Sequence, residues 1–247
     1  MTVKRSTLVI PVLVLIVTLA SMSASQARHR HPVGPHAAEN TPVGWVSEVT
    51  NPYFPLRPGT TFHYEGTSEG VSTFDDTAVT RETKVILGVI CTVVQDDAHE
   101  GGILVESTLD WYAQDLNGNV WYFGEYSKRL DPQGNVISTE GSWEAGVNGA
   151  QQGIIMEAHP RVGDKYNQEF SSGVAEDKAQ VLSVNKATCV IHGCYDDLLL
   201  TKEWSPLEKN VTEHKYYAPG VGFIRIEMVK GGEERSELVR ISTDGNP

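Results

Sequence analysis

The densest set of side chains suited to ligand binding is aromatic and lies between Thr108 and Trp143. Exposed aromatic rings stack on sugars or hold apolar ligands, and Tyr and Trp add a polar group. Alternate residues of a strand face opposite sides, so neighbouring aromatics fall on both faces of a sheet. One face then belongs to the core, and the other is either covered by a loop or lines a groove. The ligand-binding candidates are Trp111, Tyr112, Trp121, Tyr122, Tyr126 and Trp143.

Strict alternation also assigns these candidates to faces. It places Trp111 and Tyr112 on opposite sides of one strand, and it places Tyr122 and Tyr126 together on the face opposite Trp121. The competing interpretation is that all of these rings pack in the core or at a sheet edge.

Carboxylates accompany the aromatic residues. Asp110, Glu125 and Glu144 are the candidates for acid or base catalysis. Glycoside hydrolysis requires two carboxylates that flank the scissile bond at a defined separation. The chain carries 32 acidic residues, so such pairs also arise by chance, and the signal is weak.

Metal and cofactor motifs are weak or absent in the sequence. Asp115 to Asn119 resembles the start of a calcium loop, but its Gly comes one position early and Tyr126 stands where the closing acidic residue belongs. A hairpin turn explains this segment better. The sequence has no HExxH, GxSxG or phosphate-binding glycine loop. We therefore predict no metal and no cofactor.

The elements that carry these residues are predicted as three antiparallel strands. Turn signals at Leu116 to Asn119 and at Asp131 to Asn135 separate three apolar-rich runs. Gly and Asn tolerate the positive φ of tight hairpin turns, and Pro presets φ at the first turn position. Trp, Tyr, Phe and Val suit a pleated, half-buried surface. After Trp143, a Gly-rich segment from Glu144 to Gly153 predicts an irregular loop, and such loops are often functional.

The remainder of the chain also reads as short strands with turns between them. The run from Val174 to Val184 is predicted as a strand, although its composition also allows a short helix. The spacing predicts an all-β domain with a minor helix at most, in which an antiparallel meander forms a curved half-barrel, a barrel or a sandwich.

The cysteines allow two arrangements. Cys189 and Cys194 have the spacing of a disulfide across a tight turn, and we favour that pair. The alternative joins Cys91 to one of them. In the favoured arrangement Cys91 is a small buried apolar residue in the strand-like run VICTVV.

The N-terminus has the order of a secretory signal peptide. Lys4 and Arg5 precede the apolar run from Leu8 to Leu19, and small residues stand before a cleavage point after Ala27. The run is shorter than the roughly 20 residues of a membrane span. We predict a signal peptide at 1–27, a flexible leader at 28–50 and one β domain at 51–247. The protein is predicted to be exported, to the periplasm or the medium, with no transmembrane segment in the mature chain.

The charge of the chain limits its partners. Its formal charge is −12 at pH 7, and signal cleavage would remove Lys4 and Arg5 and make it more negative. This argues against nucleic acid and anionic membranes as partners. A small apolar ligand or a glycan remains compatible with it, and the sequence does not indicate an oligomeric state.

Three segments of the sequence resemble a group of exported bacterial proteins of unknown function. They are NPYFPLRPGTTFHYEG from Asn51, DWYAQDLNGNVWYFGE from Asp110 and EHKYYAPGVGFIRIE from Glu213. The group is distantly similar to β-clam proteins, such as the periplasmic lipoprotein carriers, in which a curved antiparallel sheet surrounds an apolar groove. The resemblance implies an exported β fold. It implies no catalytic residues.

Three functions follow as hypotheses. The first is an exported, non-enzymatic β protein that binds an apolar or aromatic-stacking small ligand in a groove. The second is an extracellular carbohydrate-active hydrolase or lyase that uses paired carboxylates. The third is a cell-envelope interaction module without a small ligand, which would expose an apolar patch larger than a few hundred Å².

Overall fold

A computed structural model describes residues 44–244 as an all-β domain of fifteen strands, with no helix among these residues. The prediction of an all-β fold is confirmed. No helix long and apolar enough to cross a membrane occurs within residues 44–244. The strands are β1 (Thr60–Ser68), β2 (Val71–Ile86), β3 (Val89–Glu100), β4 (Ile103–Gln114), β5 (Val120–Leu130), β6 (Val136–Ser138), β7 (Trp143–Glu144), β8 (Gln151–Met156), β9 (Lys165–Asn167), β10 (Glu169–Phe170), β11 (Lys178–Val190), β12 (Gly193–Trp204), β13 (Thr212–Ala218), β14 (Gly222–Lys230) and β15 (Glu234–Thr243).

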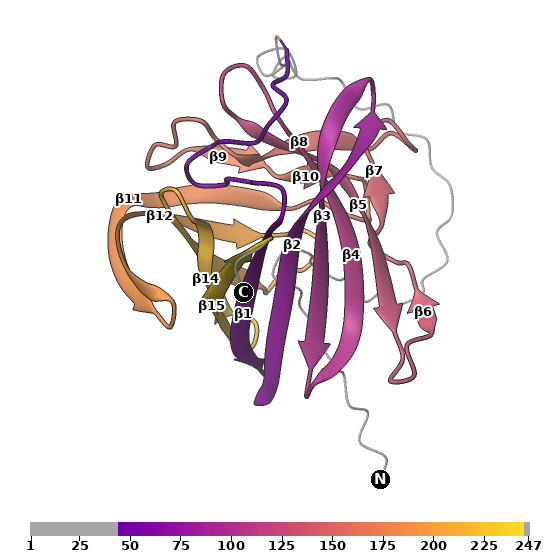
Figure 1. Ribbon diagram of the computed structural model, residues 1–247, viewed down its shortest axis with the longest axis vertical. Coiled ribbons are helices and arrows are strands. Elements are labelled where there is room, and N and C mark those ends of the chain that lie inside the picture. Colours follow the sequence, from indigo (N-terminus) through magenta and orange to yellow (C-terminus); the bar gives the residue numbers. More distant parts are fainter. Residues whose placement is uncertain (1–43, 245–247) are drawn as a thin grey trace.

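All strands belong to one strongly curved antiparallel sheet. Its order is β10-β8-β5-β4-β3-β2-β1-β15-β14-β13-β12-β11-β9, and β6 and β7 also pair with β5. Figure 1 shows β1 to β5 side by side down the molecule, whereas β11 and β12 run across it. The pairing of β1 with β15 joins the first and last strands, and it is the seam between the two halves of the sheet.

The turns of the meander form where their chemistry predicts them. The Asp115 carboxylate accepts hydrogen bonds from the backbone N–H groups of Asn117 and Asn119, both at 2.9 Å. Asp131 caps the next turn in the same way. Such Asx contacts satisfy backbone donors within a tight turn. The interpretation of Asp115 to Asn119 as a hairpin turn is therefore confirmed.

Two expected elements differ in the structure. The third strand of the meander is reduced to the short strands β6 and β7, with turns between them. The segment 174–184 contains no helix, and its strand begins only at Lys178. There β11 pairs with β12 along most of its length and with β9 at its start. Pairing on both sides outweighs the helix-forming composition of the segment.

The inner face of the curved sheet is closed by packing between the two halves. Tyr64 of β1 lies 5.2 Å from Phe223 of β14, measured between ring centroids, and its hydroxyl donates a 3.1 Å hydrogen bond to the Phe223 carbonyl. Tyr217 of β13 packs on the same ring. One hydrophobic core therefore spans both halves.

The described chain begins just before the predicted domain boundary. Trp45 packs edge-on against Phe123 at 5.2 Å, and Val49 is buried. These residues belong to the segment predicted as a leader, and they contact the sheet. The boundary at residue 51 remains a prediction. The predicted signal peptide at 1–27 lies outside the described residues.

The cysteines adopt the favoured arrangement. Cys189 and Cys194 form a disulfide that closes the turn between β11 and β12, as predicted. Cys91 is free and buried, and burial raises the pKa of its thiol to about 12. A thiol with such a pKa does not supply a thiolate nucleophile at neutral pH.

Candidate functional site

A β-bulge at Gly124 decides which way the site residues face. Tyr122 lies opposite Tyr112, but Glu125 lies opposite Asp110, so β5 carries one extra residue between these pairs. Gly124 has a φ of +128°, a conformation that favours glycine. The bulge exchanges the faces of all residues after it.

The bulge corrects one prediction. Tyr126 lies opposite Leu109 and so shares the outer face with Trp111, not the inner face with Tyr122. Strict alternation failed here because it assumes no extra residue in the strand.

We expect Gly124→Ala to destabilise the fold by more than about 1 kcal/mol. A Cβ at this position would lie 2.3 Å from the Trp143 carbonyl oxygen, and the positive φ would add strain. Urea unfolding followed by circular dichroism measures the change. Gly193→Ala is the matched control, because a Cβ there meets nothing within 4 Å, and its cost should stay below about 0.5 kcal/mol. Equal costs for the two variants would contradict the strain argument.

The outer face of β3, β4 and β5 carries a groove of about 620 Å³, which we call the meander groove. Its volume is within the range of small-ligand sites. Tyr126 is 42% exposed in it, whereas Trp111 and Trp143 are largely buried. The groove is lined by Glu82, Thr83, Lys84, Val93, Leu109, Trp111, Glu125, Tyr126, Ser142, Trp143, Glu144 and Val147.

An ion pair crosses one side of the meander groove. The Lys84 ammonium lies 2.7 Å from a Glu144 carboxylate oxygen and 3.2 Å from the centre of the Trp111 ring. A cation over an indole face gains a further attraction. The pair gives the groove a polar, neutral rim beside an aromatic and aliphatic surface. Glu144 is thus the ion-pair partner of Lys84 on the outer face. It does not form a catalytic pair with Asp110, which lies on the buried face.

The remaining aromatic candidates lie away from the groove. Tyr112 and Tyr122 are stacked on the inner face at 4.8 Å, and Trp143 packs edge-on against Tyr122. Trp121 packs against Trp45 and donates its indole N–H to Asp115 at 2.9 Å. The structure therefore brings Trp111 and Tyr126 together on the outer face. Trp143 also borders the groove, but it lies opposite Glu125 and packs against Tyr122, so it shares the packing role of the other three candidates.

Asp110 and Glu125 do form a pair, on the buried face of the sheet. Their Cα atoms are direct partners across β4 and β5. The Tyr122 hydroxyl donates a 2.6 Å hydrogen bond to one Asp110 oxygen. The second Asp110 oxygen and one Glu125 oxygen have no partner among the described residues. Burial, reinforced by neighbouring acids, raises the pKa of both groups well above their usual values.

This pair belongs to a larger buried set that we call the acidic face. Pairing across the strands places its members on one side of the sheet, because directly opposed residues share a face. All are buried, and burial is the main cause that raises the pKa of each. The acidic face consists of Asp75, Asp96, Glu106, Asp110, Glu125 and Glu234.

Lys215, on β13, is a largely buried cation close enough to the acidic face to act against the raised pKa of Glu234. The Lys215 ammonium is 3.0 Å from Glu203 and 3.8 Å from Glu213. Burial favours the neutral form of Glu203, but Lys215 and a hydrogen bond from Thr201 outweigh it and lower the pKa of Glu203. Glu213 is farther from the ammonium, and burial raises its pKa to about 7.

Metal coordination is not preformed in this region. Within residues 44–244 there is no group of three or more His, Cys, Asp or Glu side chains placed to hold a metal ion. The acids of the acidic face come from five strands, one or two to a strand.

Sequence reasoning missed Lys84. It lies on β2, and its partner Glu144 lies 60 residues along the chain. No local motif marks such a contact. The only signal in the sequence was the break in the apolar pattern of this strand, where five polar residues from Thr80 to Lys84 follow one another.

Comparison with known proteins assigns no family. No family model and no curated protein matches the sequence. A Bacteroides fragilis protein, provisionally described as exported and with a YmcC-like fold, is 13% identical; the match covers 77% of this chain and 99% of that one, with a TM-score of 0.44. A Parabacteroides distasonis protein, provisionally described as a lipoprotein, is 12% identical over 77% and 98%, with a TM-score of 0.42. These values carry no functional argument.

Proposed function

We propose that this chain is an exported β-domain protein that binds a small ligand with an apolar or aromatic body in the meander groove. The single observation that carries the proposal is the 620 Å³ groove over Leu109 and Trp111, with the exposed ring of Tyr126 at its side. The signal-like N-terminus and the disulfide support export.

The groove also suggests how such a ligand lies. Its apolar body stacks on Tyr126 and packs against Leu109 and Val147, and its polar end meets the ion pair of Lys84 and Glu144. The ligand carries little net charge, because the two charged groups neutralise each other. A purely aliphatic ligand would leave the ion pair without new hydrogen bonds.

Tyr126→Ala should weaken binding of an aromatic amphiphile about 2- to 10-fold, the effect of losing one aromatic contact. The measurement is a fluorescence titration with N-phenyl-1-naphthylamine, an uncharged aromatic amphiphile, after native mass spectrometry has shown whether protein from its natural source carries a ligand. Phe170→Ala removes an aromatic ring of similar exposure outside the groove, and it should leave the affinity unchanged. Equal affinities of the two variants, or no binding by the unmodified protein, would contradict the proposal.

A further inference from the structure

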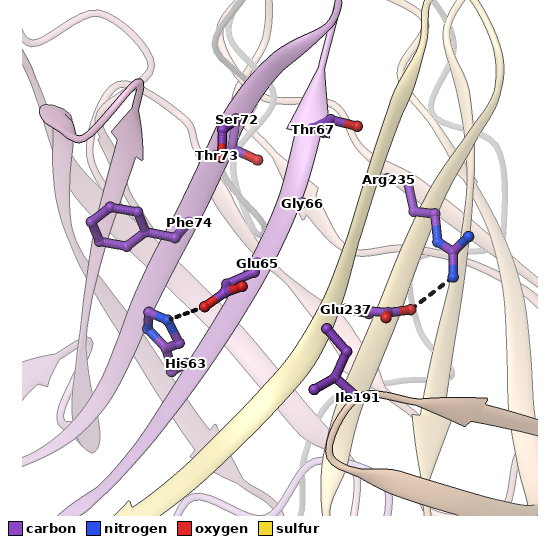
Figure 2. A pocket seen from close by; sticks show the side chains of 10 residues that line it. All are labelled: His63, Glu65, Gly66, Thr67, Ser72, Thr73, Phe74, Ile191, Arg235 and Glu237. Atoms are coloured by element: carbon purple, nitrogen blue, oxygen red, sulfur yellow. Dashed lines mark hydrogen bonds and ion pairs between the residues drawn. The ribbon is translucent and has the colours of Figure 1, made fainter.

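A second groove lies on the outer face of the seam, over β15, β1 and β2. We call it the seam groove, and its volume is about 740 Å³ (Figure 2). It is separate from the meander groove and shares no residue with it. It is lined by His63, Glu65, Gly66, Thr67, Ser72, Thr73, Phe74, Ile191, Arg235 and Glu237.

The floor of the seam groove is backbone. A Cβ on Gly66 would lie 2.1 Å from the Arg235 carbonyl oxygen, so only glycine lets β1 and β15 approach this closely. Glu65 and Glu237 are direct partners across these strands and therefore project from the same face. Figure 2 shows them on neighbouring strands, with His63 on one side and Arg235 on the other.

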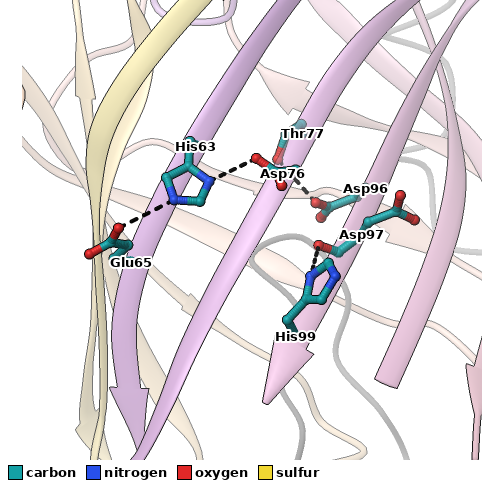
Figure 3. Close-up of polar contacts among 7 residues, drawn as sticks. All are labelled: His63, Glu65, Asp76, Thr77, Asp96, Asp97 and His99. Atoms are coloured by element: carbon teal, nitrogen blue, oxygen red, sulfur yellow. Dashed lines mark hydrogen bonds and ion pairs between the residues drawn. The ribbon is translucent and has the colours of Figure 1, made fainter. Parts of the chain in front are cut away.

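The polar groups of the seam groove are held in place by one another. The His63 imidazole lies between Asp76 at 2.7 Å and Glu65 at 3.3 Å (Figure 3). Arg235 donates a 2.8 Å hydrogen bond to Glu237. The contact with His63 uses one carboxylate oxygen of Glu65, and the contact with Arg235 uses one carboxylate oxygen of Glu237. The other carboxylate oxygen of each residue makes no hydrogen bond to another side chain of the described part, so both can accept from a ligand.

Apolar surface lies on two sides of these polar groups. Phe74 stacks on His99 at 4.0 Å with an interplanar angle of 12° and lies 5.7 Å from His63, so three rings form a row. On the other side is Ile191, which is 62% exposed at the tip of the β11–β12 hairpin. Figure 2 shows Phe74 on one side of Glu65 and Ile191 on the other side, beside Glu237.

The hairpin tip is a fixed wall. The disulfide between Cys189 and Cys194 closes its turn, and the His192 N–H donates a 3.0 Å hydrogen bond to the Leu238 carbonyl of β15. The pairing of β14 with β15 ends at Glu237, so this bond gives a partner to the next carbonyl of β15, that of Leu238. A wall anchored at both points loses little freedom when a ligand binds, which favours affinity.

We propose that the seam groove binds an uncharged saccharide. Hydroxyl groups of a sugar donate to Glu65 and Glu237 and accept from Arg235, while the C–H face of the ring packs on Phe74. Planar carboxylate and guanidinium groups suit neighbouring hydroxyls, because each presents two atoms side by side. The two carboxylates disfavour a polyanion, and the contacts of Glu237 with Arg235 and of Glu65 with His63 reduce the attraction for an organic cation. This inference does not depend on the ligand of the meander groove.

The test is isothermal titration calorimetry of the unmodified protein with the hexasaccharides of glucose (both α-1,4 and β-1,4), xylose and mannose. We expect binding of at least one, weakened at least 10-fold by Phe74→Ala and by Glu65→Gln. Arg235→Ala is a third variant with little risk to folding, because its side chain is 54% exposed. Tyr126→Ala is the control and should leave the saccharide affinity unchanged.

The outcomes separate the two sites. Loss of saccharide binding in the seam variants, with retained binding of the fluorescent amphiphile, supports two distinct sites. No binding of any of the four hexasaccharides, or binding that none of the seam variants weakens, overturns the proposal. Binding abolished by Tyr126→Ala but not by Phe74→Ala also overturns it, because it places the sugar in the meander groove.

Discussion

The protein is expected to become easier to unfold as the pH rises from 5 to 9. The acidic face and its neighbours hold carboxyl groups whose pKa burial has raised, to about 7 for Asp96, Glu106 and Glu213 and to about 9 for Glu234. The folded state therefore binds more protons than the unfolded chain, in which these groups have pKa values near 4. Stability is then greatest at low pH and is lost as the pH rises through the folded pKa values.

The contribution of one buried carboxyl group sets the minimum loss of stability. A carboxyl that is protonated in the folded state and ionised in the unfolded chain costs about 1.4 kcal/mol of stability per pH unit. Between pH 5 and 7 this is about 3 kcal/mol, which for a domain of this size lowers the melting temperature by roughly 6 to 12 °C. Several groups act together, so the observed loss should be at least this large.

One group opposes the trend within this range. Burial lowers the pKa of His214, so the folded state disfavours its protonation, but one imidazole offsets only part of the loss from several carboxyl groups. Glu203 is the one buried acid whose pKa is lowered, so its contribution is lost only when the pH falls below about 4. Other groups facing the acidic face act with it: burial and neighbouring acids raise the pKa of Glu169 on β10 well above its usual value, and that of Asp177 to about 6. The opposing cation, Lys215, keeps its charge throughout.

Urea unfolding at pH 5, 6, 7 and 8 measures the slope directly. Asp110→Asn removes one titrating group while keeping an oxygen that can accept from the Tyr122 hydroxyl. It should flatten the slope by about 1.4 kcal/mol per pH unit. Glu140→Gln, at an exposed position, is the control and should leave the slope unchanged. Stability that is constant or increases from pH 5 to 8 would show that the buried carboxyls are solvated or paired in solution.

Local chemistry in the sequence was enough to predict the first two strands of the meander and both of its turns. Asp, Asn and Gly specify the turns at 115–119 and 131–135, and these turns fix where β4 and β5 pair. The disulfide was predictable for the same reason, because Cys189 and Cys194 are close in sequence and flank a turn. Each of these features depends on residues only a few positions apart.

The faces of the sheet were not predictable, because one glycine decides them. Gly124 could have been an ordinary strand residue, and nothing adjacent to it marks a bulge. Its presence moves Tyr126 to the outer groove and Glu125 to the buried face. The bulge therefore changes which candidate residues share a face, and a binding role for any of them stays a prediction.

The seam groove could not be predicted from the sequence, for a different reason. It requires the pairing of β1 with β15, whose residues lie about as far apart in the domain as the chain allows, as in Glu65 and Glu237. Alternation within each strand shows which side chains share a face, but not which strand lies alongside. The acidic face could not be predicted either, because its members come from five different strands and look like surface acids in the sequence.

Lys215→Met should be the most destabilising single substitution among the buried charges, at about 3 to 5 kcal/mol at pH 8. The side chain is only 12% exposed, and its ammonium is the partner of Glu203 at 3.0 Å. Removing it leaves a buried carboxylate without a counterion, beside Glu213. Met keeps the volume of the aliphatic chain, so the loss measures charge rather than packing.

The pH dependence of this loss separates an ion pair from simple packing. Without Lys215, burial would raise the pKa of Glu203, so protonation at pH 5 should recover part of the stability that is missing at pH 8. The double variant Lys215→Met with Glu203→Gln should recover more than half of the loss at pH 8, because neutral pairs avoid the cost of an unpaired buried charge. Lys202→Met on the neighbouring strand β12, where the ammonium only lies over Trp204, should cost less than about 1 kcal/mol. A loss for Lys215→Met that is the same at both pH values and is not recovered in the double variant would mean that Lys215 acts through its hydrocarbon chain and not through its charge.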